Sequence, residues 1–98
     1  MKYVFHSAAR VEFVQAVVHY ETQKFGLGEN FEREIYRCLN AIAATPLSFP
    51  RIYGEVRRCL TNTFKYAVVY RAQPDGTIVV IAVAHQSRRP RYWRSRLK

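Results

Sequence analysis

The spacing of the apolar residues changes near the middle of this chain, and that change constrains the fold more than any other feature. Over roughly the first 45 residues, apolar side chains recur every three or four positions, which is typical of amphipathic helices. From residue 55 onward they alternate or run together, which is typical of strands. The sequence therefore predicts a helical first half and a sheet-forming second half.

Two helices account for the first half. Ser7 is the expected N-cap of the first helix, because its hydroxyl can accept a hydrogen bond from an early helical N–H. Gly26 offers a left-handed stop, and Pro46 ends a second helix that is expected to begin near Glu29 or Asn30. The short break between them predicts an antiparallel hairpin. The two apolar faces comprise Ala9, Phe13, Ala16, Val17 and Tyr20, and then Phe31, Ile35, Leu39 and Ile42.

Four strands are expected around this hairpin: residues 3–5, 55–60, 64–71 and 77–84. The last is almost entirely β-branched or Ala, which predicts a central strand buried on both faces. Residues 46–54 are predicted as a loop, and Pro74-Asp75-Gly76 as a turn. The expectation is one α+β domain over residues 1–98, with the order β-α-α-β-β-β and an antiparallel sheet packed on a helical hairpin.

The formal net charge of +9 on 98 residues is confined to the second half. Residues 1–50 carry five basic and five acidic side chains, whereas residues 51–98 carry eleven basic and two acidic ones. Six of these basic residues lie in the last eleven positions. A field this positive favours an acidic partner, and the count alone does not distinguish nucleic acid from protein.

Several classes of chemistry are disfavoured. The sequence has no Gly-rich phosphate loop, no HExxH or GxSxG motif and no CxxC pair. Cys38 and Cys59 are expected to be small buried residues rather than ligands or a disulfide. We therefore expect no metal and no cofactor. No signal-peptide-like segment opens the chain, and the longest apolar run, 78–84, is too short to span a membrane, so we expect a cytoplasmic protein.

The segment after residue 84 is the densest functional signal. His85 ends the last strand, where a side chain is held rigidly yet stays accessible, and its unperturbed pKa lies near neutrality. Cations and aromatic residues then alternate, a mixture that suits either nucleic acid or a protein partner. The competing interpretation is that the two aromatic residues fold back on the sheet. The candidate target-binding residues are Arg88, Arg89, Arg91, Tyr92, Trp93 and Arg94.

Six stretches of the sequence, in this order and spacing, resemble the RelE/ParE superfamily of toxins from bacterial type II toxin–antitoxin systems. The resemblance spans nearly the whole chain and is greatest for the ParE-like, plasmid stabilisation branch, although many members there carry Pro in place of Ser7 and Lys65. The stretches are residues 5–9, 25–31, 46–50, 56–60, 64–70, and 82–85 followed by 88–93.

The resemblance implies the same element order and a partner antitoxin that wraps and neutralises the toxin. It also implies one of two activities. RelE-like members cut mRNA on the ribosome without metal, using Arg, Lys, Tyr or His side chains, whereas ParE-like members poison DNA gyrase by binding it. Under the nuclease alternative, the working residues of this chain would be Arg58, His85 and Tyr92.

Two cations of the RelE-like pattern are missing from this chain. Ala67 stands where an arginine precedes the end of the third predicted strand, and Gln86 stands where an arginine follows the last one. Arg71 and Arg88 lie nearby in sequence, but Arg71 is expected on the opposite face of its strand from Tyr70. The resemblance therefore favours a toxin that binds gyrase over an mRNA endonuclease.

Overall fold

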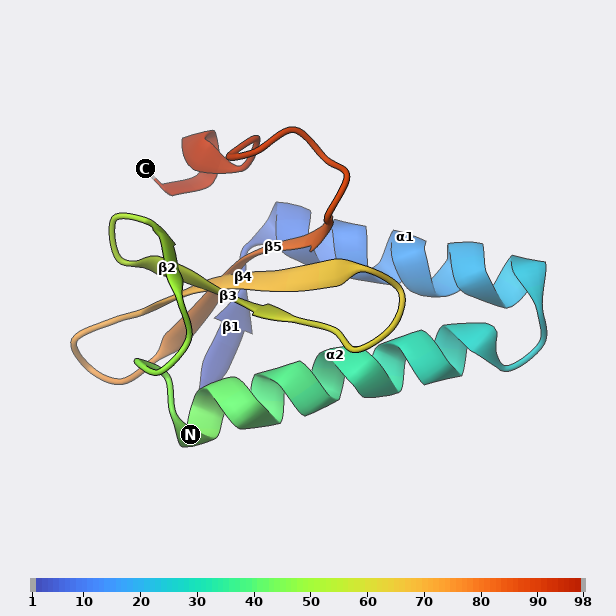
Figure 1. Cartoon of the computed structure of the whole chain (residues 1–98), viewed down its shortest axis with the longest axis horizontal. Coiled ribbons are helices and arrows are strands. Elements are labelled where there is room, and N and C mark those ends of the chain that lie inside the picture. The colour runs from blue at the N-terminus through green and yellow to red at the C-terminus, as the bar shows by residue number, and fades with distance from the viewer. Residues whose placement is uncertain (1, 98) are drawn as a thin grey trace.

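The computed structural model describes residues 2–97 and consists of a five-stranded sheet with a helical hairpin on one face (Figure 1). The hairpin tip projects beyond the sheet (Figure 1). The α+β class and the strand–helix–helix–strand order are as expected. The elements are β1 (Tyr3–Phe5), α1 (Ser7–Gln23), α2 (Leu27–Ala44), β2 (Arg51–Tyr53), β3 (Val56–Leu60), β4 (Tyr66–Ala72), β5 (Ile78–His85) and a 3₁₀ turn, η1 (Arg94–Leu97).

The strands lie in the order β1-β5-β4-β3-β2. Consecutive strands from β2 to β5 pair antiparallel. In contrast, β1 pairs parallel with β5, with Tyr3 opposite Ile78 and Phe5 opposite Val80. The sheet is therefore mixed, and the expectation of a purely antiparallel sheet is wrong at this edge. β5 lies between β1 and β4 and is buried on both faces, as its composition predicted.

A fifth strand lies in the segment that was expected to be a loop. Arg51–Tyr53 forms β2 and pairs with β3 through a tight turn in which Gly54 takes φ 56°. Three residues are too few to display the two-residue alternation that identifies a strand in a sequence. β2 forms one edge of the sheet and thereby supplies a wall to the surface described below.

Both helices turn the faces that their periodicity predicted toward the core; the face of α2 is fully buried, whereas Val17 and Tyr20 on α1 are only partly buried. The first residues of the helices differ slightly from expectation. His6, rather than Ser7, caps α1, because its Nδ1 accepts the Ala8 N–H at 3.1 Å. Gly26 takes the expected left-handed conformation, with φ 86°, but α2 begins directly after it, at Leu27.

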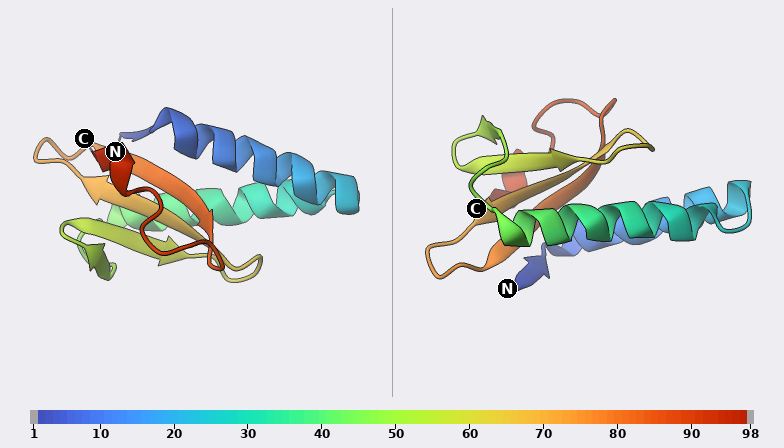
Figure 2. Two further views of the ribbon diagram at one scale, coloured as in Figure 1. Left: turned by 90° about the horizontal axis from the view of Figure 1, so that it is seen from above. Right: turned by 60° about the horizontal axis from the view of Figure 1, so that its bottom comes forward.

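The sheet carries a hydrophobic core on each face. The core under the helices centres on Phe31, which lies among the rings of Tyr20, Phe64 and Tyr66 at centroid distances of 4.8–5.3 Å. The second core lies on the opposite face, under the end of the chain (Figure 2). A bulge between β4 and β5 turns two consecutive residues, Ile81 and Ala82, toward this second core.

Cys38 and Cys59 are buried and free, as predicted. The neighbouring Cys59 thiol and burial together raise the pKa of Cys38, so that this thiol stays protonated. Cys38 approaches the carbonyl oxygens of Cys59 and Leu60 at 3.9 and 3.6 Å, as a weak donor does. In this setting it behaves as a small apolar core residue.

Gly28 lies where α2 packs tightly against α1. A Cβ on Gly28 would lie 2.5 Å from the Val17 carbonyl oxygen and 3.0 Å from two side-chain atoms of Glu21. The Glu21 carboxylate also accepts the N–H groups of Gly26 and Gly28, at 2.9 and 3.0 Å, and so ties the hairpin together. Only glycine allows this approach without separating the helices.

Replacing Gly28 with alanine is expected to lower the free energy of unfolding by about 1–3 kcal/mol. The helix propensity of alanine alone would raise it by about 1 kcal/mol, so the clash must exceed that gain. Chemical denaturation measures the change, with Asn40→Ala on the exposed side of α2 as the control. A more stable Gly28→Ala protein would contradict the close packing of the hairpin.

Candidate binding site at the C-terminal tail

The residues after β5 fold back across the sheet. We call residues 86–97 the tail, and we call the sheet surface opposite the helices, together with the tail, the tail face (Figures 1 and 2). Trp93, which is only 4% exposed, is the main anchor of the tail in the second core, and its ring meets the edge of Tyr53 at a centroid distance of 6.2 Å. The Trp93 side chain is thus part of the core, and Tyr92 beside it is half-buried.

Glu12, on α1, holds the tail in place. Its carboxylate accepts the Tyr92 hydroxyl at 2.6 Å and both terminal nitrogens of Arg96 at 2.9 Å. It also accepts the Val83 N–H at 3.1 Å, while Arg96 donates to the Ile81 carbonyl at 3.0 Å. β1 pairs only with residues 78–80 of β5. Beyond this point, Glu12 and Arg96 supply the hydrogen-bond partners of the Val83 N–H and the Ile81 carbonyl on the same edge of β5. We call this group the Glu12 clasp.

The clasp sets the ionisation of its members. Burial alone would raise the pKa of Glu12, but hydrogen bonds from Arg96, Tyr92 and Val83, with the charge of Arg96, hold it below its usual value. Burial and the bond to Glu12 raise the pKa of Tyr92 well above its usual value. The Tyr92 hydroxyl therefore keeps its proton and directs it toward Glu12.

Glu12→Gln tests this ionisation. Because folding lowers the pKa of Glu12, its carboxylate stabilises the fold above the pKa of the unfolded chain, and this contribution is lost as pH falls through the folded pKa. We expect the substitution to lower the free energy of unfolding by about 1–3 kcal/mol at pH 7 and the difference from wild type to shrink in acid. Urea denaturation across pH measures this, with the exposed Glu55→Gln as control. A difference that is constant with pH would contradict the ionic role.

A pocket of about 270 Å³ opens between the tail and the sheet. It brings together the three residues of the nuclease alternative, since Arg58 of β3, His85 of β5 and Tyr92 of the tail all line it. Five of the six candidate target-binding residues, Tyr92 included, line the pocket, and Arg94 lies outside it. The remaining lining residues are Ile52, Ala67, Val69, Ala84, Gln86, Arg88, Arg89, Pro90, Arg91 and Trp93.

Three exposed arginines of the tail, Arg88, Arg91 and Arg94, are stacked on aromatic rings. The Arg88 guanidinium lies 3.9 Å from the centroid of Tyr92, and those of Arg91 and Arg94 lie 5.2 and 5.4 Å from the centroid of Tyr53. Within residues 2–97, none of these three makes an ion pair with a carboxylate. Their N–H groups are therefore held at the surface and available to an anion.

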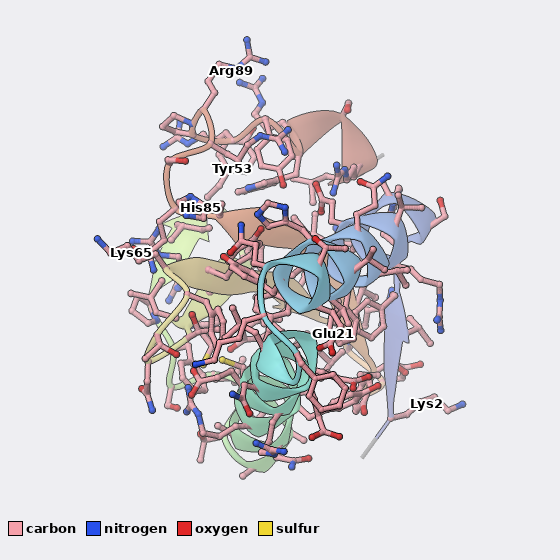
Figure 3. The ribbon with its side chains drawn as sticks, turned by 90° about the vertical axis from the view of Figure 1, so that its right-hand side faces the viewer. Lys2, Glu21, Tyr53, Lys65, His85 and Arg89 are labelled. Atoms are coloured by element: carbon pink, nitrogen blue, oxygen red, sulfur yellow. The ribbon has the colours of Figure 1, made fainter. Side chains whose placement is uncertain are left out.

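His85 lies beneath the tail, and Arg89 reaches outward from it (Figure 3). The His85 Nδ1 accepts the Ser87 N–H at 3.0 Å and lies 2.7 Å from the Ser87 hydroxyl oxygen. A backbone N–H can only donate, so the proton of the neutral ring is on Nε2. His85 can thus offer an N–H to a ligand.

The two positions that lack the nuclease cations are both at this site. Ala67 is buried in the pocket floor, and Gln86 donates from its side chain to the Tyr66 carbonyl at 3.4 Å. Arg71 lies near Glu55 at the opposite end of β4 and does not line this pocket, whereas Arg88 does. Arg88 is the nearby cation that the pocket gains in their place.

The sequence alone does not indicate that Glu12 holds the tail. There, Glu12 is one of five acidic residues in the first half of the chain, which has no net charge. Its contacts with Tyr92 and Arg96 join residues 80 and 84 positions apart, and local sequence patterns carry no such signal. In the part of the chain that the structure describes, no three His, Cys, Asp or Glu side chains lie close enough together to hold a metal ion. No helix among those residues is long and apolar enough to span a membrane.

Comparison with known proteins gives a match to a family model and matches to solved structures. The model of the family described as "ParE toxin of type II toxin-antitoxin system, parDE" matches residues 3–90. A solved structure from P. aeruginosa, described as a chromosomal ParDE toxin–antitoxin system, is similar with a TM-score of 0.65 at 13% identity, covering 87% of this chain and 95% of that one. No curated protein matched the sequence. Because the family match spans almost the whole chain, including the pocket's strands and the first residues of the tail, this protein belongs to the ParE toxin family of type II toxin–antitoxin systems.

Proposed function

We propose that this chain is a toxin that acts by binding and poisoning DNA gyrase and that a cognate antitoxin neutralises it. One observation carries the choice of binding over RNA cleavage: the Tyr92 hydroxyl donates its proton to Glu12, in a pocket where Ala67 and Gln86 replace cations. Cleavage needs a base for the 2′-hydroxyl and a proton donor for the leaving group. A tyrosine with a raised pKa that already donates to a carboxylate suits neither role.

The tail presents residue types that dominate protein interfaces. Arg88, Arg89, Arg91 and Arg94 are exposed, and arginine and tyrosine are enriched at interface hot spots. Trp93 supports this surface by anchoring the tail from below. The same basic face suits an antitoxin segment rich in acidic side chains, since complementary charge speeds association and excludes like-charged competitors.

A supercoiling assay with purified gyrase and plasmid DNA tests the proposal. We expect the wild-type protein to inhibit supercoiling or to trap a cleaved complex, and Arg89→Ala/Arg91→Ala to be much weaker. Arg33→Ala/Arg37→Ala on α2 is the matched control, because it removes the same charge from the helical side. Unchanged supercoiling with the wild-type protein would refute gyrase as the target.

The RelE-like alternative, a ribosome-dependent and metal-independent mRNA endonuclease, is favoured by one observation. Arg58, His85 and Tyr92 line the same pocket although they come from three separate segments. If cleavage occurred, His85→Ala and Tyr92→Phe would each abolish it on mRNA in the ribosomal A site. Full toxicity of both variants with intact mRNA would exclude this alternative.

A further inference from the structure

The tail face carries an excess of positive charge that the protein does not neutralise. Ion pairs among residues 2–97 involve only Arg33, Arg37, Arg51 and Arg96. Arg58, Arg88, Arg89 and Arg91 line one pocket, and no carboxylate of the described residues lies within 4 Å of their charged nitrogens. Four unpaired guanidiniums that converge on one opening make a site for a ligand that bears several negative charges.

Three of the tail arginines are already ordered in the free protein. The stacking of Arg88 on Tyr92, and of Arg91 and Arg94 on Tyr53, restricts side chains that would otherwise lose rotamer freedom on binding. A stacked guanidinium keeps the N–H groups at its edge for phosphate oxygens, and its outer face can receive a nucleobase. A chain of phosphates and planar bases can use both the edge and the outer face, whereas a carboxylate uses only the edge.

The pocket between these arginines has room for a single nucleotide unit. Its floor is apolar, formed by Ala67, Val69 and Ala84, and His85 can supply a neutral N–H donor at its rim. A volume of about 270 Å³ admits one sugar–base unit and excludes a duplex. A single strand can place one unit in the pocket while its neighbouring phosphates contact the arginines.

We propose that the tail face binds single-stranded nucleic acid directly, through its phosphates and one nucleotide seated in the pocket, without cutting it. The proposal goes beyond gyrase binding and does not depend on it. Cleavage is not part of it, because Glu12 engages the Tyr92 hydroxyl and no residue of the pocket is a carboxylate that could act as a base.

Fluorescence anisotropy with labelled oligothymidylate and oligouridylate of about 15 nucleotides tests the proposal. We expect both to bind, and more tightly than a duplex of equal length. For single strands, the slope of log K against log salt concentration is about −0.7 per phosphate neutralised, so Arg58→Gln/Arg89→Gln should flatten it by about 1.4. Gel electrophoresis of the oligouridylate after incubation should show it intact.

The matched control is Arg33→Gln/Arg37→Gln, which removes the same charge from α2, outside the pocket. It should retain most of the wild-type affinity and slope. The emission of Trp93, the one tryptophan of the chain, reports whether each variant keeps the tail folded. If Arg58→Gln/Arg89→Gln unfolds the tail, Arg89→Gln alone, at an exposed position, replaces it, with an expected flattening of about 0.7.

Four results would overturn the proposal. Equal losses in the pocket and control variants would show non-specific attraction to net charge. Equally tight binding of polyglutamate would show that an acidic polypeptide is the ligand. Tighter binding of the duplex would exclude the pocket, and cleavage of the oligouridylate would support the nuclease alternative. These binding assays contain no gyrase, so their results do not depend on whether the gyrase proposal is correct.

Discussion

Trp93→Ala is expected to lower the free energy of unfolding by about 3–5 kcal/mol, because it removes the largest side chain of the second core. Trp93 is buried against a bulged region of β5, where Ile81 and Ala82 both face it. The remaining tail would lose its apolar anchor and rely on the Glu12 clasp alone. Activity against the target should therefore fall together with stability.

Urea denaturation followed by circular dichroism measures this change, since the substitution removes the only tryptophan. Trp93→Phe keeps an apolar ring and should lose less than half as much stability. Leu47→Ala is the control, because Leu47 is 67% exposed and its truncation should change stability by less than about 0.5 kcal/mol. A Trp93→Ala protein as stable as wild type would mean that the tail does not pack on the sheet.

Phe31→Ala, in the core under the helices, is expected to lower the free energy of unfolding by a similar amount, about 3–5 kcal/mol. Phe31 is fully buried and touches rings from α1, from the β3–β4 turn and from β4. Its removal would leave a cavity that these rigid neighbours fill poorly, and each aromatic pair adds about 0.5–1.5 kcal/mol beyond burial.

Phe25 offers a matched control for this substitution. It has the same side chain, six positions earlier, but it is 95% exposed at the tip of the hairpin. Phe25→Ala should change stability by less than about 0.5 kcal/mol. Equal effects of the two substitutions in thermal or chemical denaturation would contradict the packing of α2 on the sheet.

The helical hairpin could be predicted from sequence because both helices bury one periodic stripe. The positions from Phe31 to Ile42 that were expected to be apolar and buried are all buried. The ends of the helices are harder to predict, because the capping residue depends on which nearby polar group has the better hydrogen-bond geometry. His6 precedes Ser7 and reaches the Ala8 N–H first, which leaves Ser7 as the first helical residue.

The sheet was less predictable, because strand pairing joins distant segments. The parallel pairing of β1 cannot be deduced from three residues, and β2 is equally short. The turn before β4 also differs from what the sequence resemblance implies. Lys65 has φ 53°, which a proline ring cannot adopt, so the proline that the resemblance leads one to expect at this position is incompatible with this turn.

The candidate site was predicted as a set of residues but not as an arrangement. The cation-rich tail was evident from composition, and both interpretations of its aromatic residues were available. The structure buries Trp93 and leaves Tyr92 half-buried with its hydroxyl bonded to Glu12. That Arg58 faces the same pocket depends on the order of strands in the sheet, which local patterns do not encode.

The pairing of β1 with β5 has a consequence for the order of events during synthesis. Tyr3 pairs with Ile78, so the first strand has no partner until most of the chain has been made. A shorter nascent chain has the helical hairpin without the central strand that covers its apolar face. Contacts this distant in sequence also slow folding. The tail that carries the basic surface follows all five strands along the chain, so a chain translated only as far as β5 cannot present the surface proposed to act on the target.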